Sequence, residues 1–340
     1  MQDPGSPHAG LEQSGSTIEP ILVAQDLHRS YGSRRALRAL SFSLRPGRVL
    51  GFLGPNGAGK TTAIRVLTTI LQPTAGRFVV DGVGSEHPER IRRKIGVLPE
   101  GLGFPQHSTG VEYLTYFGQL YGRRPADARR IGLELLGDVG LRKRGDSLVG
   151  TYSHGMRQRL GIARALVNDP RVVFLDEPTL GLDPRGQQEL LALVQRIARE
   201  RNAGVVLSSH LLSEIEGICD DVVIMNQGQI VAKGTVAEVI GQARPDGARS
   251  NLVRIRVPVS SVASAIAILA TVPGIRRTDP DSTGWLLVES SDDPGAPAGD
   301  LDRNRILDAL IRAEIPILGF EAAGGRLQDV FLQLTAETIG

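Results

Sequence analysis

Short apolar runs alternate with helix-spaced apolar residues along the first 240 residues of the chain. Runs dense in Val, Ile, Leu and Phe are typical of strands buried on both faces of a parallel sheet. They predict strands at residues 48–53, 95–100, 171–178 and 204–210. Apolar residues three and four apart predict helices at 62–71, 156–167 and 186–201. This alternation favours an α/β fold with a largely parallel sheet.

The remaining elements of this first part are more varied. An alternating pattern predicts an edge strand over 21–30 and a second strand over 39–44, and 221–225 with 229–231 read as a hairpin-like pair. Helical spacing at 112–121 and 126–141 predicts a helical insert at about 100–165. We therefore expect residues 18–241 to form one nucleotide-binding unit, preceded by a disordered leader at 1–17.

The pattern changes after residue 241. A segment rich in Gly, Pro and Arg at 242–250 predicts a linker. Strands are expected at 252–257, 275–278, 285–289 and 315–320, with helices at 260–270 and 303–312 and a last helix at 327–334. This order, βαββαβ, predicts a small ferredoxin-like α+β domain at 251–340.

Composition narrows the possible partners. The chain has 340 residues, with 39 Lys and Arg against 37 Asp and Glu, so its net charge of +2 gives no general attraction to nucleic acid. The single cysteine, Cys219, excludes an internal disulfide and fits a reducing compartment. The longest weakly polar run falls short of the ~18 apolar residues of a membrane span, so we expect any membrane passage to come from another polypeptide.

Residues 54–62 read GPNGAGKTT and fit the phosphate-loop pattern G-x-x-x-x-G-K-[ST], between a predicted strand and a predicted helix. Glycines let backbone N–H groups turn inward onto phosphate oxygens at a positively polarised helix start. We expect Lys60 to bridge the β- and γ-phosphates and Thr61 to place its hydroxyl on Mg²⁺. The predicted contacts to ATP here are Gly54, Pro55, Asn56, Gly57, Ala58, Gly59, Lys60, Thr61 and Thr62.

The apolar strand at 171–176 ends in the carboxylate Asp176, and a second carboxylate, Glu177, follows it directly. Because ligands bind beyond the carboxyl ends of strands in open α/β sheets, Asp176 is expected to hold the metal and Glu177 to polarise the attacking water. His210 ends the next predicted strand at the same edge. A lone histidine is usually structural, but at this edge it could reach a γ-phosphate.

Two further positions are ambiguous on local grounds. Tyr31 could stack on an adenine ring or could simply pack in a turn beside Gly32. Ser153 predicts a helix N-cap, and with Gly155 it could form a second anion site at that helix start. For Ser153 and Gly155, an ordinary capped helix is the simpler interpretation.

Taken in order, these motifs resemble the ATP-binding subunit of an ABC transporter from about residue 21 to residue 240. Tyr31 corresponds to the adenine-stacking aromatic, residues 54–62 to the Walker A loop, and Asp176 with Glu177 to the Walker B pair. The segment YSHGM at 152–156 stands where LSGGQ is usual. Glu100 lies at the Q-loop position, Asp183 at the D-loop aspartate and His210 at the switch histidine.

The resemblance implies a mechanism. Two cassettes, a second copy or a related one, would sandwich two ATP molecules head to tail, each phosphate loop facing the other subunit's Ser153 and Gly155. Asp183 would lie beside this nucleotide, and Glu100 would join Thr61 and Asp176 around Mg²⁺. Glu177, His210 and Lys60 would act in hydrolysis. A multi-span permease would convert closure into transport, which places the chain peripherally on the cytoplasmic face of the membrane.

Two departures point to a branch of the family. Glu100 replaces the usual glutamine, and His154 replaces the first glycine of the signature. Both resemble the ATPases that pair with ABC-2-type membrane proteins, mostly exporters of drugs, antibiotics, polysaccharides or lipids. The last predicted helix also resembles the end of an accessory domain in drug exporters, for which we expect a regulatory or dimer-stabilising role.

Two other classes remain open: a soluble non-transport ABC ATPase and a low-turnover regulatory nucleotide-binding module. Translation-type members usually carry two cassettes, and this chain has one phosphate loop. DNA-maintenance members insert long coiled coils, and no sustained heptads separate Lys60 from Ser153. Intact Lys60 and Glu177 argue against the regulatory module, while Glu100 and His154 leave it possible.

Overall fold

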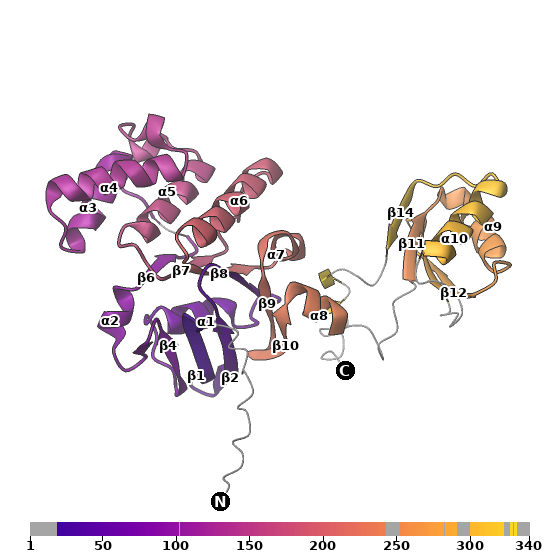
Figure 1. The fold of residues 1–340 in the computed structure, drawn as a ribbon, viewed down its shortest axis with the longest axis horizontal. Coiled ribbons are helices and arrows are strands. Elements are labelled where there is room, and N and C mark those ends of the chain that lie inside the picture. Colours follow the sequence, from indigo (N-terminus) through magenta and orange to yellow (C-terminus); the bar gives the residue numbers. More distant parts are fainter. Residues whose placement is uncertain are drawn as a thin grey trace, which may run out of the picture.

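The computed structural model describes residues 19–101, 103–242, 252–281, 283–290, 300–322, 327, 328, 330 and 331. Two sheets and their helices make up the part before residue 243, and a third sheet lies in residues 252–322 (Figure 1). The predicted leader at 1–17 and most of the linker at 242–250 lie outside the described residues. The predicted domain boundaries therefore stay a prediction.

A six-stranded sheet carries the nucleotide motifs. Its order is β10-β9-β3-β8-β7-β6, with β9, β3, β8, β7 and β6 parallel and β10 antiparallel to β9. The bounds are β3 Val49–Leu53, β6 Ile95–Leu98, β7 Val172–Asp176, β8 Gly204–Ser209, β9 Asp221–Asn226 and β10 Gln229–Thr235. Every residue of β3, β7 and β8 is buried, which agrees with their continuous apolar sequence.

The second sheet is antiparallel, in the order β2-β1-β4-β5. Its strands are β1 Leu22–Tyr31, β2 Arg34–Leu44, β4 Ala75–Val80 and β5 Val83–Gly84. The prediction of an edge strand at 21–30 is wrong, because β1 lies inside the sheet and Leu22 faces both Leu44 and Val80. An alternating pattern reports which face of a strand is buried. It carries no information about which of the strand's two edges is paired.

Helices cover the six-stranded sheet and form the insert. Near the sheet are α1 Lys60–Leu67, α2 Pro88–Arg92, α5 His154–Leu166, α6 Pro184–Glu200, α7 Leu212–Ile218 and α8 Val236–Gln242. The insert contains α3 Gly110–Leu120 and α4 Pro125–Asp138, which pack on each other. Helix α1 ends earlier than predicted, because Thr69 adopts a φ of 62°, outside the helical region.

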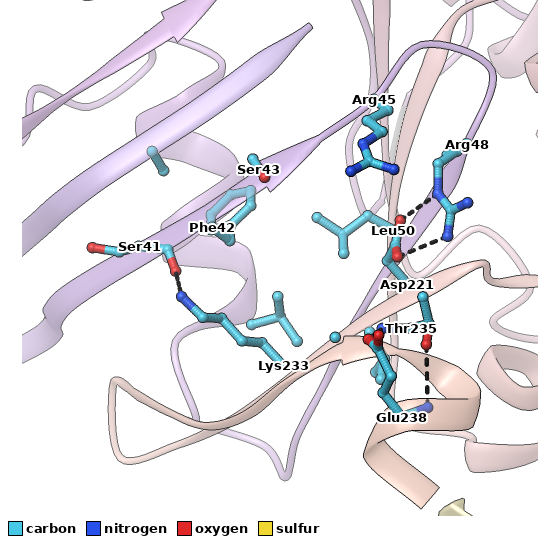
Figure 2. A pocket seen from close by; sticks show the side chains of 14 residues that line it. Ser41, Phe42, Ser43, Arg45, Arg48, Leu50, Asp221, Lys233, Thr235 and Glu238 are labelled. Carbon is cyan, nitrogen blue, oxygen red and sulfur yellow. Dashed lines mark hydrogen bonds and ion pairs between the residues drawn. The ribbon is translucent and has the colours of Figure 1, made fainter. Parts of the chain in front are cut away.

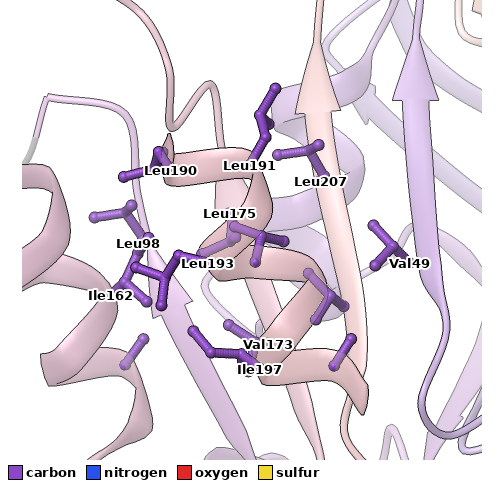
Figure 3. Packing of buried hydrophobic residues seen from close by; sticks show 14 of the residues in the cluster. Val49, Leu98, Ile162, Val173, Leu175, Leu190, Leu191, Leu193, Ile197 and Leu207 are labelled. Atoms are coloured by element: carbon purple, nitrogen blue, oxygen red, sulfur yellow. The ribbon is translucent and has the colours of Figure 1, made fainter. Parts of the chain in front are cut away.

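The main core lies between this sheet and the helices on one of its faces. Leucine and isoleucine side chains of the amphipathic helix α6 reach down onto β7 and β8 (Figure 3). The residues that meet there include Leu98, Ile162, Val173, Leu175, Leu190, Leu193, Ile197 and Leu207. A buried side chain of this size contributes about 1.5–3 kcal/mol, so this packing fixes the strand ends on which the chemistry depends.

Residues 252–322 form the predicted βαββαβ unit. Its elements are β11 Leu252–Arg256, α9 Val262–Leu269, β12 Ile275–Pro280, β13 Trp285–Ser290, α10 Asp300–Arg312 and β14 Gly319–Ala322. The antiparallel order β12-β13-β11-β14 is the ferredoxin-like arrangement, and a separate apolar cluster holds it together. Strand β14 begins four residues later than predicted, because the apolar residues 315–318 precede the paired segment.

The last described residues pack against the first part of the chain. Leu327 and Val330 are buried in the same core cluster as α6 and α7. The backbone N–H of Leu327 donates to Glu216 Oε1 on α7 at 3.1 Å. None of the described helices combines the length and the apolar character that a membrane crossing requires.

Candidate functional site

The phosphate loop curls between β3 and α1, and two of its glycines have no substitute. Gly59 has a φ of 107°, and a Cβ there would lie 2.8 Å from the carbonyl oxygen of Ala36. A Cβ on Gly54 would lie 2.3 Å from the carbonyl oxygen of Met225. Both contacts are shorter than a carbon can tolerate, so the backbone can take this course only with glycine.

Lys60 begins α1 and points back into this loop. Its side chain is 7% exposed, and Nζ donates to the carbonyl of Gly54 at 2.6 Å. Glu177 Oε1 lies 3.9 Å from Nζ. Burial lowers the pKa of Lys60, and the charges of Glu177, Asp176 and Glu100 oppose that shift. The fold therefore holds a cation close to the strand-end carboxylates.

Asp176 ends β7 and is 4% exposed. Ser208 Oγ on β8 donates to Asp176 Oδ1 at 2.7 Å, and Thr61 Oγ1 lies 3.4 Å from the same oxygen. Carboxylate and hydroxyl oxygens are the donors that Mg²⁺ takes, usually with one or two carboxylates completed by phosphates and water. The donor set around Asp176 and Thr61 therefore fits Mg²⁺, and Glu100 lines the same cavity as Thr61, so the three predicted ligands stay a prediction.

Glu177 follows Asp176 in an unusual backbone conformation. Its φ is 49°, a left-handed value that costs a non-glycine residue about 1–3 kcal/mol. Its N–H donates to Ser208 Oγ at 2.9 Å, and its Oε2 lies 2.8 Å from His210 Nδ1. Its side chain is 10% exposed, whereas that of His210 is 43% exposed. The turn thus aims the carboxylate at the phosphate loop and at His210.

One cavity of about 550 Å³ collects most of the predicted residues. It is lined by Tyr31, Pro55, Asn56, Gly57, Ala58, Gly59, Lys60, Thr61, Thr62, Glu100, Glu177 and His210. Four more lining residues, Arg34, Ala36, Arg65 and Leu180, were missed by sequence reasoning. Arg34 could have been found from its place three residues after Tyr31. Strands β1 and β2 pair antiparallel here, and Tyr31 lies directly opposite Arg34.

Comparisons with known proteins agree with this geometry. A family model described as "ABC transporter" matches residues 37–180. The daunorubicin/doxorubicin resistance ATP-binding protein DrrA of Streptomyces peucetius is 36% identical over 91% of this chain and 90% of its own length. This chain belongs to the ABC transporter family. It is an ATP-binding subunit of that family and an ATPase.

Other relatives support the same assignment. The bacitracin transport ATP-binding protein BcrA of Bacillus licheniformis is 41% identical over 63% of this chain and 69% of its own length. Among solved structures, an ABC transporter ATP-binding subunit aligns with a TM-score of 0.58 and 31% identity, covering 65% of this chain and 92% of its own. The fold predicted from the sequence, a P-loop ABC cassette followed by a small ferredoxin-like unit, is confirmed. ATPase subunits of this family dimerise and pair with membrane permease subunits.

The signature residues of this ABC subunit lie apart from the phosphate loop. Ser153 caps α5 as predicted, its hydroxyl accepting from the N–H of Met156 at 3.2 Å. Ser153, Gly155 and Asp183 line a second hollow of about 370 Å³, together with Leu182 and His154. None of these five residues lines the cavity at the phosphate loop. Within one chain, the structure does not bring the two sets of predicted nucleotide contacts together.

A third cavity, of about 540 Å³, lies among β2, β3, β9 and β10, and most of its charged side chains bond to groups of the protein itself (Figure 2). Arg48 makes a two-pronged ion pair with Asp221, at 2.7 and 2.8 Å. Lys233 donates to the carbonyl of Ser41, and Glu238 caps α8 by accepting from the N–H of Thr235. The Lys233 contact joins the six-stranded sheet to the second sheet, and the other two contacts lie within the six-stranded sheet and its flanking helix, so we interpret this cavity as structural.

Proposed function

We propose that this chain hydrolyses Mg-ATP at a head-to-tail dimer interface and thereby drives export through a separate ABC-2-type permease. The observation that carries the dimer is the division of the nucleotide contacts between two hollows of one chain. Each hollow is completed only when the signature of a second copy meets the phosphate loop. Export is supported by the relatives named for drug resistance and bacitracin transport, the first aligned over 91% of this chain.

In this mechanism the phosphate loop binds first. Backbone N–H groups of residues 55–60 face the phosphates, and the Lys60 ammonium moves from the Gly54 carbonyl to the β- and γ-phosphate oxygens. Tyr31 stacks on the adenine through one face of its ring. The guanidinium of Arg29 lies over the Tyr31 ring, 4.9 Å from its centroid, and steadies it.

The second copy then closes on the γ-phosphate. Its Ser153 hydroxyl and the N–H of its Gly155 become donors to phosphate oxygens, as the start of a helix favours. Closure excludes water other than the attacking molecule. Thr61 and Asp176, with Glu100 lining the same cavity as Thr61, would hold Mg²⁺, which would supply positive charge to the phosphate oxygens.

Hydrolysis uses the groups already paired at the sheet edge. Water attacks the γ-phosphorus, its proton passes to the Glu177 carboxylate, and the bond to the β-phosphate oxygen breaks. His210, 2.8 Å from Glu177, orients that carboxylate and contacts the γ-phosphate. Loss of the γ-phosphate removes the ligand shared by the two copies, so the dimer opens and the permease changes its access.

The experiment is co-purification of tagged Glu177→Gln protein from membranes with ATP and Mg²⁺. The variant should form a stable ATP-bound dimer with a multi-span protein, which also tests the proposed peripheral place on the cytoplasmic face of the membrane. The matched control carries Lys60→Ala in addition and should release both partners. Recovery of ribosomes, DNA or no partner by a folded, ATP-binding protein would instead favour the soluble ATPase or the regulatory module.

A further inference from the structure

His154 makes a contact that its position in the signature does not require. It is the first residue of α5 and directly follows the cap Ser153. Its Nε2 lies 2.9 Å from the carbonyl oxygen of Leu180. Because a carbonyl can only accept, Nε2 carries the proton and donates it. The imidazole therefore ties the start of α5 to a segment 26 residues further along the chain.

Leu180 belongs to the tight turn that follows Glu177. The N–H of Leu180 donates to the Glu177 carbonyl at 3.2 Å, and the N–H of Leu182 donates to the Thr179 carbonyl at 3.1 Å. The side chain of Leu180 lines the phosphate-loop cavity, whereas Leu182 lines the signature hollow. The turn thus passes from one nucleotide hollow to the other, and His154 is bonded to its middle.

The fit at this contact is close. Gly181 has a φ of 76°, and a Cβ there would lie 3.4 Å from His154 Nε2. The left-handed backbone is what favours glycine at 181, and the ring of His154 lies in van der Waals range of this position. A glycine at position 154, which the family usually carries, would have no side chain to make this bond.

We propose that His154 is a positioning residue that couples the two nucleotide sites of the dimer. The inference rests on the proposed head-to-tail dimer, in which Ser153 contacts the partner's nucleotide. When Ser153 makes this contact, the start of α5 shifts. The hydrogen bond from His154 then pulls on the Leu180 carbonyl. The turn then passes the shift to Glu177, whose carboxylate serves the nucleotide bound by the same chain. In this way binding at one site adjusts the hydrolytic carboxylate at the other.

Three variants of the full-length chain test this. His154→Ala removes the donor. His154→Gln restores it, because the amide nitrogen of glutamine is separated from Cα by as many bonds as Nε2 of histidine. His87→Ala is the matched control, since His87 is an exposed histidine at the start of α2 with its ring 3.7 Å from Glu86.

The first readout is amide hydrogen exchange in the nucleotide-free protein. The peptide covering residues 178–183 should exchange about 3- to 10-fold faster in His154→Ala, the effect expected for one lost hydrogen bond. It should return towards the wild-type rate in His154→Gln and stay unchanged in His87→Ala. Equal exchange in wild type and His154→Ala would show that the bond does not hold the turn, and would overturn the proposal.

The second readout is ATP hydrolysis as a function of ATP concentration. His154→Ala should bind ATP as tightly as wild type, because it does not line the phosphate-loop cavity, yet lose about 5- to 10-fold in kcat, with a Hill coefficient that falls towards 1. His154→Gln should recover both. A wild-type Hill coefficient of 1, or a His154→Ala curve that matches wild type, would refute coupling. Neither result bears on which permease co-purifies, so the transport proposal is judged separately.

Discussion

The phosphate-loop side and the signature side of this subunit differ in how much one chain completes by itself. On the first side, Lys60 and Asp176 are buried, Glu177 is largely buried, and each lies within contact distance of another of the three or of Ser208. On the second, Ser153 is exposed and its hydroxyl is used to cap its own helix. In the proposed dimer, one half of the site is thus assembled within a single chain, and the other half is completed by the second chain.

The physical cause is where each group sits in the fold. Parallel strands β3, β7 and β8 end at one edge, so their last residues are gathered by the sheet and held by the core beneath. Helix α5 is buried along its later turns, whereas its start, with Ser153 and His154, is exposed and lines a hollow separate from the phosphate loop. Buried groups keep a fixed geometry, whereas the exposed helix start keeps donors available for a ligand on another chain.

Removal of the hydrolytic carboxylate should have the largest effect. Glu177→Gln should bind ATP normally and lose about 10²- to 10⁴-fold in kcat, the range for a lost general base. Steady-state ATPase assays with equilibrium nucleotide binding measure both. The control is Glu134→Gln, an exposed carboxylate paired with Arg130 on α4, which should leave both unchanged. Normal turnover in Glu177→Gln would place the base elsewhere.

The second largest effect is expected at Lys60, the cation of the phosphate-loop side. Lys60→Ala should weaken ATP binding by about 10- to 100-fold, since hydrogen bonds to charged groups contribute about 1.5–3 kcal/mol each. Titration with a fluorescent ATP analogue measures this in the monomer. Lys143→Ala, in the exposed 3₁₀ turn Arg142–Arg144, is the control. If Lys60→Ala binds ATP at wild-type affinity, the loop does not hold phosphate through this amine.

The signature side should respond in the opposite manner. On the proposed dimer, Ser153→Ala should leave ATP affinity of the monomer unchanged but reduce kcat about 10-fold, because the lost hydroxyl would serve only the partner's nucleotide. It should also destabilise the protein by about 1 kcal/mol through loss of the cap. Ser153→Thr keeps a capping hydroxyl and should restore stability. Weakened ATP binding in monomeric Ser153→Ala would remove the contrast between the two sides.

The smallest effect is expected at Tyr31, the side chain proposed to stack on the adenine ring. Tyr31→Ala should weaken ATP binding about 5-fold, near the lower end for loss of a base-stacking aromatic. Arg29 covers one face of the Tyr31 ring, which leaves at most the other face for an adenine. Tyr31→Phe keeps the stacking face and should bind as wild type. Competition binding with GTP and ATP measures the nucleotide affinity. An unchanged ATP affinity in Tyr31→Ala would indicate that the ring merely packs in its turn.

Much of the phosphate-loop side was readable from the sequence. The glycine pattern, the apolar strands and the polar residue at each strand end are local features, and the parallel sheet gathers them by rule. Arg34 and Arg65 were missed because their side chains reach the cavity from β2 and α1 without any motif of their own. The same limit explains the wrong placement of β1, since pairing on both edges involves residues up to 58 positions away, as for Leu22 and Val80 (80 − 22).

The sequence by itself determined the family, the order of the elements and which residues could meet a triphosphate, because each depends on short spacings and on alternation of apolar positions. Only the tertiary structure decided that Ser153 and Gly155 line a hollow separate from the phosphate loop, that Leu327 docks on α7, and that His154 donates to Leu180. Those contacts join segments far apart in the chain. They exist because packing of the core brings particular helix faces and turns together. No local sequence pattern specifies which distant segments will meet.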